Sequence, residues 1–257
     1  MSADAGASSA VPYVDYGYGS HVGLRRELNE DSFVVTDRLF AVADGMGGHE
    51  AGEVASSLAV QALAQGWESY AGQVGEREIG QFLDDADQRI RSATDSKAGT
   101  TLTGAVVVEA EDNATGEDTQ GQWQWLVFNI GDSRTYLLSD GALIRLTRDH
   151  SQVQELVDSG MITAQEMHSH PHRNVITRAL GAGDSWGADF SKATVQPGQR
   201  LLVCSDGLTG ELTDEEIGRI LNAGRNVQDT VDWLIHQALR QGGRDNVTVV
   251  LVDVKDH

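Results

Sequence analysis

The 257-residue sequence has little cysteine, little proline and few positive charges. Cys204 is its only cysteine, so no disulfide can form within the chain, and we expect a reducing, cytoplasmic compartment. The opening segment MSADAGASSAVPYV lacks the basic start and the apolar stretch of a signal peptide. Because no stretch approaches the roughly 18 uninterrupted apolar residues of a membrane helix, we expect a soluble protein without a membrane segment.

The shortage of positive charge is large: 19 Lys and Arg stand against 39 Asp and Glu, a formal net charge of −20. Such a field repels a phosphate backbone and argues against nucleic acid as a partner. The excess acid either keeps the protein soluble or is partly neutralised by bound cations. With 40% hydrophobic residues and only three prolines, the composition is that of a globular protein rather than a disordered one.

Hydrophobic spacing predicts blocks of strands alternating with pairs of helices. Apolar residues recur at helical spacing over about 50–70 and 79–93, and the segment VQDTVDWLIHQALRQ is amphipathic. Strands are predicted in DSFVVTD, RLFAVAD, GTTLTGAVVVEA, WQWLVFNIGD, RTYLLSD, ALIRLT, RLLVCSD and NVTVVLVDV. Strands grouped with strands and helices in pairs favour an α+β layer architecture, and no repeat or break in composition indicates a second domain.

Turn and capping residues mark the ends of these elements. Asp140 and Gly141 predict a tight hairpin turn between two strands. Capping residues precede three helical segments: Asp149 and Ser151, Thr163 with Glu166, and Thr213 with Glu216. The acidic segment EDNATGEDTQGQ has no periodicity and is predicted to be an exposed loop.

Several strands share one feature, an aspartate beside a glycine at the strand end. The segments are AVADGMGG with Asp44, NIGDSR with Asp132, LLVCSDG with Asp206 and, ahead of its strand, GGRDNVTVV with Asp245, together with RRELNEDSF, which holds Glu30 and Asp31. Each Asp-Gly pair alone is an ordinary turn signal. Together, carboxylates at strand ends can converge on one edge of a sheet assembly, where they would repel one another without a cation. Clustered oxygen ligands are what Mg²⁺ or Mn²⁺ requires.

An arginine close to these acids adds a phosphate-binding group. Arg26 lies four residues before Glu30, and a guanidinium can hold a phosphoryl group with two parallel hydrogen bonds. Two ions and an arginine make a centre for phosphate-ester hydrolysis, in which water acidified by the metals attacks phosphorus in line.

The blocks RRELNEDS, ADGMGGHEAGE, GTTLTGAVV, NIGDSRTYLL, LTRDHS, LLVCSDGLT and GGRDNVTVVLV follow one another along the chain. In order and style they resemble the PPM/PP2C family of metal-dependent protein serine/threonine phosphatases, particularly its bacterial members. The resemblance implies a central β-sandwich of two antiparallel sheets flanked by pairs of helices, a four-layer α-β-β-α fold. The resemblance covers residues 12–255 as one domain. The small, polar residues 1–11 predict a flexible tail before it, and the polar, irregular segment HSHPHRNVITRALGAGD predicts a flap at about 150–185.

The resemblance also implies a metal centre with two or three Mn²⁺ or Mg²⁺ ions. Asp44 resembles the acid that bridges two ions, with the Gly45 carbonyl on one of them. Asp206 and Asp245 resemble the other ligands of this pair. Glu30 resembles an acid that reaches a metal through water.

Further roles are carried over from the same family pattern. Asp132, with Asp206, would serve a third and weaker ion, Arg26 matches the phosphate-binding arginine, and Asn246 resembles a supporting hydrogen-bonding residue. Animal members carry a histidine where this chain has Met46. The nearby His49 is then a candidate general acid, with a surface position or donation by a metal-bound water as the alternatives.

The activity expected from the resemblance is hydrolysis of phosphoserine and phosphothreonine in proteins, opposing a bacterial serine/threonine kinase. Partners would be phosphorylated proteins, including such a kinase or its targets, and the chain is expected to be a monomer. A non-catalytic phosphoprotein-binding member and a hydrolase of nucleotides or other small phosphate esters are the rival interpretations. A thiolate phosphatase is disfavoured, because Gly210 stands six positions after Cys204 where that chemistry needs an arginine.

Overall fold

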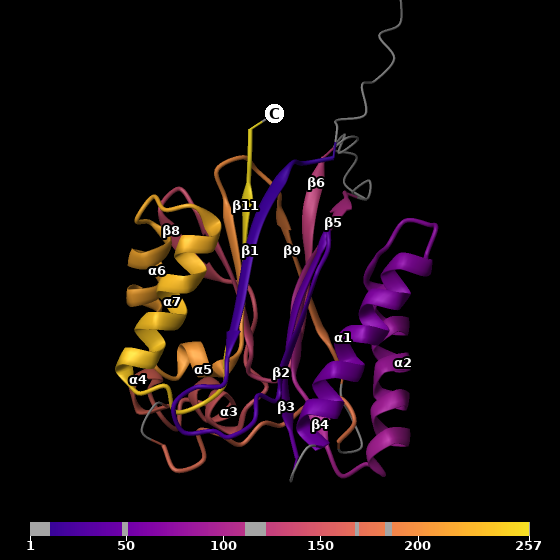
Figure 1. The fold of residues 1–257 in the computed structure, drawn as a ribbon, viewed down its shortest axis with the longest axis vertical. Helices are drawn as coiled ribbons and strands as arrows, with labels where there is room; N and C mark the ends of the chain where they lie inside the picture. The colour runs from indigo at the N-terminus through magenta and orange to yellow at the C-terminus, as the bar shows by residue number, and fades with distance from the viewer. Residues whose placement is uncertain (1–10, 48–50, 111–121, 168–169, 183–186, 257) are drawn as a thin grey trace, which may run out of the picture.

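Two antiparallel sheets pack face to face in the computed structural model, which describes residues 11–47, 51–110, 122–167, 170–182 and 187–256 (Figure 1). Within these residues the first sheet has the strand order β1 (Val14–His21), β11 (Val247–Val254), β10 (Arg200–Cys204), β7 (Arg134–Ser139) and β8 (Ala142–Arg145). The second has the order β2 (Asp31–Val35), β3 (Leu39–Met46), β5 (Leu102–Glu109), β6 (Trp123–Ile130) and β9 (Asp189–Thr194), with the short β4 (Gly99–Thr100) beside β3.

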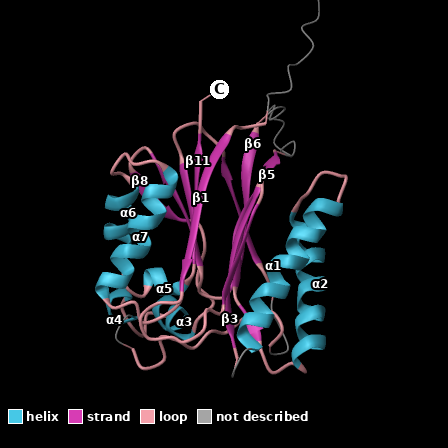
Figure 2. Ribbon diagram, viewed as in Figure 1, coloured by secondary structure: helices cyan, strands magenta, loops and turns pink. Residues whose placement is uncertain are grey.

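Helices cover the outer face of each sheet (Figure 2). The pair α1 (Ala51–Ser69) and α2 (Glu76–Thr94) packs on the second sheet, and α6 (Asp214–Leu221) with α7 (Val227–Gln241) packs on the first. Three short helices lie at one end of the sandwich, α3 (Gln152–Asp158), α4 (Ala164–Met167) and α5 (Asp206–Thr209). The predicted four-layer α-β-β-α fold is confirmed. Among the helices of the described residues, none has the length and apolarity to cross a lipid bilayer.

The layers explain why the central strands are apolar on both faces. Side chains alternate along a strand, so Phe40 and Val42 of β3 enter the core between the sheets while Leu39 and Ala41 face the helices. A strand covered on both sides has no face for polar residues. For this reason β5 and β11 are almost continuous apolar runs, and burial on both faces anchors the strand ends that carry the acids.

Most predicted elements are present close to their expected positions. The hairpin turn has the left-handed backbone that the Asp140-Gly141 pair predicts, with φ of 50° and 78°. Two strands, β1 and β9, are not identified by the sequence pattern. In β1 the reason is visible: Gly17 and Gly19 weaken the strand signal, yet α7 packs so closely that a Cβ at Gly17 would lie 3.0 Å from the Gln228 backbone.

The predicted caps are partly confirmed. Ser151 caps α3 by accepting a hydrogen bond from the Gln154 N–H at 3.3 Å, whereas the prediction that Asp149 also caps this helix is wrong, because its carboxylate is paired with Arg134. Almost all of the predicted tail at 1–11 and of the acidic loop at 111–122 lies outside the described residues.

The capping box of α6 provides a stability test. Thr213 Oγ1 accepts from the Glu216 N–H at 3.3 Å, and the Glu216 carboxylate accepts from the Thr213 N–H at 3.0 Å. We expect Thr213→Ala to lower the free energy of unfolding by about 1 kcal/mol, because it leaves an N-terminal N–H of the helix without its acceptor. Urea titration followed by circular dichroism measures this loss. Thr213→Ser keeps the hydroxyl and should retain wild-type stability; equal losses in both variants would contradict the capping role.

Candidate metal centre

The segments that carry the predicted acids come together at one end of the sandwich, where α5 follows β10 (Figure 1). Asp44 lies near the end of β3 and pairs in register with Asp31 of β2. Asp206 follows β10 and starts α5, while Asp245 lies two residues before β11, the neighbour of β10. Asp132 lies in the turn between β6 and β7. The two sheets therefore bring acids from distant parts of the chain to a common edge.

The segment GTTLTG fixes the backbone of Asp44. The Thr101 hydroxyl accepts from the Asp44 N–H at 3.0 Å, and the Thr100 hydroxyl donates to the Asp44 carbonyl at 2.9 Å. The Thr101 hydroxyl also hydrogen-bonds Ser133, the residue after Asp132, at 2.8 Å. Two of the acid-bearing segments are thus held at a fixed separation by buried hydroxyl groups.

The carboxyl groups of Asp44 and Asp206 lie close enough to hydrogen-bond each other. Burial, followed by the charges of Asp31, Asp206 and Asp132, raises the pKa of Asp44 well above its usual range. Burial and the charge of Asp206 likewise raise the pKa of Asp132. Without a cation the acids therefore relieve their mutual repulsion by retaining protons.

Asp31 is a member of this cluster that the sequence-based site assignment leaves out. The residue is 8% exposed, and its Oδ1 has no hydrogen-bond partner among the described residues. Its Oδ2 accepts from the Ser205 hydroxyl at 2.8 Å. Burial is the main cause that raises the pKa of Asp31 to about 7, with the charges of Asp206 and Asp245 adding to it. The segment RRELNEDSF already groups Asp31 with the converging acids in the sequence, but the family pattern assigns it no role.

Arg26 and Asn246 close the other side of the cluster. Arg26 Nη2 donates to Asp245 Oδ2 at 2.8 Å, and the Arg26 side chain remains 49% exposed. Asn246 donates to the carbonyls of Val22 and Leu28 and accepts from the Glu30 N–H, each at 2.9 Å. Asn246 thereby holds the loop that carries both Arg26 and Glu30 against the start of β11.

Two glycines allow the backbones to approach the acids. The Gly45 N–H donates to the Glu30 carbonyl at 3.0 Å, and a Cβ at Gly45 would lie 2.6 Å from that carbonyl oxygen. A Cβ at Gly52, in the first turn of α1, would collide with the Glu30 carboxylate, which accepts a hydrogen bond from the Gly52 backbone. Gly52 is a second residue that the sequence-based assignment omits.

The donor set suits a hard divalent cation. Carboxylates and a glycine carbonyl are the oxygen ligands that Mg²⁺ and Mn²⁺ prefer, and a cation would replace the protons that the crowded acids retain. In the part of the chain that the structure describes, no group of three or more His, Cys, Asp or Glu side chains is arranged so that it could hold one metal ion. The described side chains therefore offer no more than two carboxylates to any one ion, and Mg²⁺ commonly combines one or two protein carboxylates with water.

Two other predicted features have different outcomes. His49 lies outside the described residues, so its role stays a prediction. Cys204 is buried in β10, and burial raises the pKa of its thiol to about 12. A thiol that stays protonated at neutral pH is a poor nucleophile, which agrees with the expectation that the chain is not a thiolate phosphatase.

The arrangement as a whole combines a crowded set of carboxylates with one half-exposed guanidinium. Acids in this state bind divalent cations, and a guanidinium with donors to spare binds oxyanions such as phosphate. Hydrolysis of a phosphate ester is a reaction that uses both.

Comparison with known proteins also points to hydrolysis of phosphate esters. The family model described as protein phosphatase 2C matches residues 24–242. Serine/threonine protein phosphatase PstP of Mycobacterium tuberculosis is 42% identical over 249 residues, covering 94% of this chain and 45% of that protein. Serine/threonine phosphatase stp of Listeria monocytogenes is 35% identical over 245 residues, covering 90% and 92%. The chain thus spans less than half of the length of the mycobacterial relative.

Solved structures share the fold. The crystal structure of the catalytic domain of serine threonine protein phosphatase PstP in complex with two manganese ions has a TM-score of 0.81 and 37% sequence identity. The match covers 95% of this chain and 99% of that one.

Proposed function

The chain belongs to the protein phosphatase 2C family, and from that premise we propose that it hydrolyses phosphoserine and phosphothreonine in proteins with the help of divalent metal ions. The observation that carries the proposal is the convergence of Asp44, Asp206 and Asp245 beside the half-exposed Arg26. The name of the mycobacterial relative and its manganese-bound catalytic domain support the same reading.

We assign the metal-holding roles to the acids at the strand ends. Asp44, Asp206 and Asp245 would hold two ions together with the Gly45 carbonyl, Glu30 would act through water, and Asp132 would serve a third ion with Asp206. Bound ions would lower the pKa of water and polarise the phosphoryl oxygens. The dense hydrogen bonding around Asp44 means that the backbone of this acid is fixed before substrate arrives.

Arg26 would bind and orient the phosphoryl group. One of its amino groups is held by Asp245, which fixes the side chain, and its other N–H groups have no hydrogen bond to a described residue. A guanidinium held in this way can present a fork of donors to two phosphoryl oxygens. The leaving alkoxide needs a proton, for which His49 remains our candidate, with a metal-bound water as the alternative.

The test is a metal titration of the full chain with matched substrates. The protein is stripped of metal and assayed with Mn²⁺ and with Mg²⁺ on a phosphoserine peptide, a phosphothreonine peptide and a nucleoside triphosphate. We expect hydrolysis of both peptides that rises with the metal and is abolished by EDTA. Activity that persists in EDTA would overturn the metal-dependent mechanism, and faster turnover of the nucleotide would favour the small-ester hydrolase.

Finer points belong to the same proposal. We propose that either Mn²⁺ or Mg²⁺ can occupy the centre and that phosphorylated proteins, including a serine/threonine kinase or its targets, are the partners. A monomer in the cytoplasm of a bacterium is our expectation for its state and location, and the lone buried Cys204 suits a reducing compartment.

A further inference from the structure

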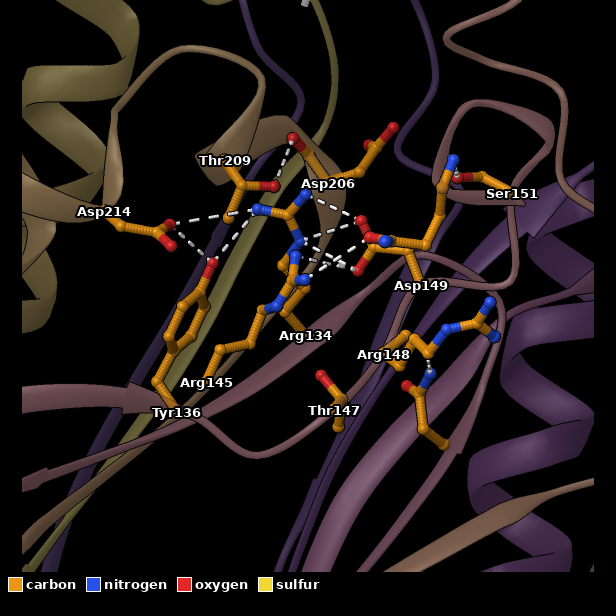
Figure 3. Close-up of polar contacts among 12 residues, drawn as sticks. Arg134, Tyr136, Arg145, Thr147, Arg148, Asp149, Ser151, Asp206, Thr209 and Asp214 are labelled. Atoms are coloured by element: carbon orange, nitrogen blue, oxygen red, sulfur yellow. Dashed lines mark hydrogen bonds and ion pairs between the residues drawn. The ribbon is translucent and has the colours of Figure 1, made fainter. Parts of the chain in front are cut away.

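A buried arginine lies beside the acid cluster without belonging to it. The Arg134 side chain is 14% exposed, and its Nε and Nη2 donate to the Asp149 carboxylate at distances from 2.7 to 3.2 Å. On the other side, Arg134 Nη1 donates to the Tyr136 hydroxyl at 3.1 Å (Figure 3). The guanidinium is therefore held on two sides, in a single orientation.

Further polar side chains surround this Arg134–Asp149 pair. The Tyr136 hydroxyl donates to Asp214 Oδ1 at 2.9 Å, and Arg145 Nη1 lies 3.6 Å from Asp149 Oδ1 (Figure 3). Asp149 is 3% exposed and Tyr136 is fully buried, whereas Asp214 is 56% exposed. The buried part of the network thus pairs one cation, Arg134, with one anion, Asp149.

The position of Arg134 in the sheet places its charge next to the metal acids. It starts β7 two residues after Asp132, and it pairs in register with Cys204, two residues before Asp206. Chain order and strand register thus place Arg134 beside both segments that carry these acids, the turn with Asp132 and the end of β10 before Asp206. A fixed positive charge at this position attracts the same carboxylates that a divalent cation would bind.

We propose that Arg134 is a positioning residue that acts as a built-in cation for Asp132 and Asp206, and that Asp149 sets how much of its charge these acids experience. The inference rests on the metal-dependent function proposed above. With Asp149 ionised, the pair is close to neutral and a divalent ion can bind beside it. If Asp149 loses its charge, the unbalanced guanidinium repels the ion and competes with it for the carboxylates.

This arrangement predicts opposite effects for two successive substitutions. Asp149→Asn keeps the shape of the side chain but removes the counter-charge, so we expect the weakest Mn²⁺-binding step of the full chain to become about tenfold weaker. Adding Arg134→Gln to that variant removes the unbalanced cation. We expect the double variant to return to within about threefold of the wild-type affinity. A purely structural role for the pair would instead leave the double variant as weak as the single one, or weaker.

The measurement is the concentration of free Mn²⁺ by electron paramagnetic resonance during titration, which requires no substrate turnover. Thermal melting confirms that each variant is folded. Asp85→Asn is the matched control, because it removes the same charge from an exposed pair with Arg89 on α2, and its Mn²⁺ affinity should be unchanged. If Asp149→Asn does not fold, the exposed Asp214→Asn replaces it, with an expected weakening of about twofold.

The outcomes separate this inference from the proposed function. A wild-type chain that binds no Mn²⁺ would refute the proposed metal-dependent function itself. Normal wild-type binding, with Asp149→Asn unchanged or with no recovery in the double variant, would overturn the role of Arg134 alone.

Discussion

Asp44→Asn should reduce turnover of a phosphoserine peptide by about a thousandfold while leaving the protein folded. The carboxylate of Asp44 sits at the centre of the acid cluster, where it interacts with the charges of Asp31, Asp132 and Asp206. Asparagine has the same shape but carries no charge to hold two cations. Each catalytic step that requires the bound ions should therefore be slower than in the wild type.

The stability of this variant should change in the opposite direction. Burial and neighbouring acids raise the pKa of Asp44, so its charged form is disfavoured in the folded state. An acid whose pKa is raised by folding lowers the free energy of unfolding as the pH rises above the pKa that the acid has in the unfolded chain. Neutral asparagine avoids that cost, and we expect the metal-free variant at pH 8 to melt at the same temperature as the wild type or higher.

Kinetics and melting of the same preparation check both expectations. Asp140→Asn is the matched control, because it makes the same chemical change in an exposed hairpin turn whose left-handed backbone asparagine tolerates. Its activity should equal that of the wild type. Retained activity in Asp44→Asn would contradict the role assigned to Asp44. The melting curve shows whether any loss of activity arises from unfolding instead.

Gly45→Ala is expected to abolish metal binding and to lower the free energy of unfolding by about 3 kcal/mol or more. A Cβ at this position would collide with the Gly52 carbonyl and lie 2.6 Å from the Glu30 carbonyl oxygen. Both of these neighbours are backbone atoms, which cannot rotate out of the way. To accept the methyl group, β3 must move away from the first turn of α1 and from the loop that carries Glu30.

A second glycine provides the control for this substitution. Gly80 lies within α2, and a Cβ there would meet no atom within 4 Å. Gly80→Ala should raise stability by about 0.5–1 kcal/mol, since alanine loses less backbone entropy in a helix. Urea titration and Mn²⁺ binding are measured on both variants. A Gly45→Ala protein with wild-type stability and Mn²⁺ affinity would show that the close approach of these backbones is not required.

Local sequence determined much of the fold. The continuous apolar run of β3 and the helical spacing of apolar residues over α1 are visible in the chain itself, because each depends on neighbours a few residues apart. The turn at Asp140 and Gly141 and the cap at Thr213 follow from the same short range. The order of the blocks that resemble the phosphatase family also indicated which strand ends carry acids, including Asp44 and Asp206.

Only the tertiary structure decided which polar groups lose water and which partners they meet. Asp31 is buried and bonded to Ser205, 174 positions away, and Asp149 pairs with Arg134 rather than capping a helix. Periodicity along a chain says which face of an element is apolar, but it does not say which two faces will meet. The pKa of a carboxyl group and the partner of a buried arginine depend on which elements pack together, because both are set by burial and by charges brought close from distant segments.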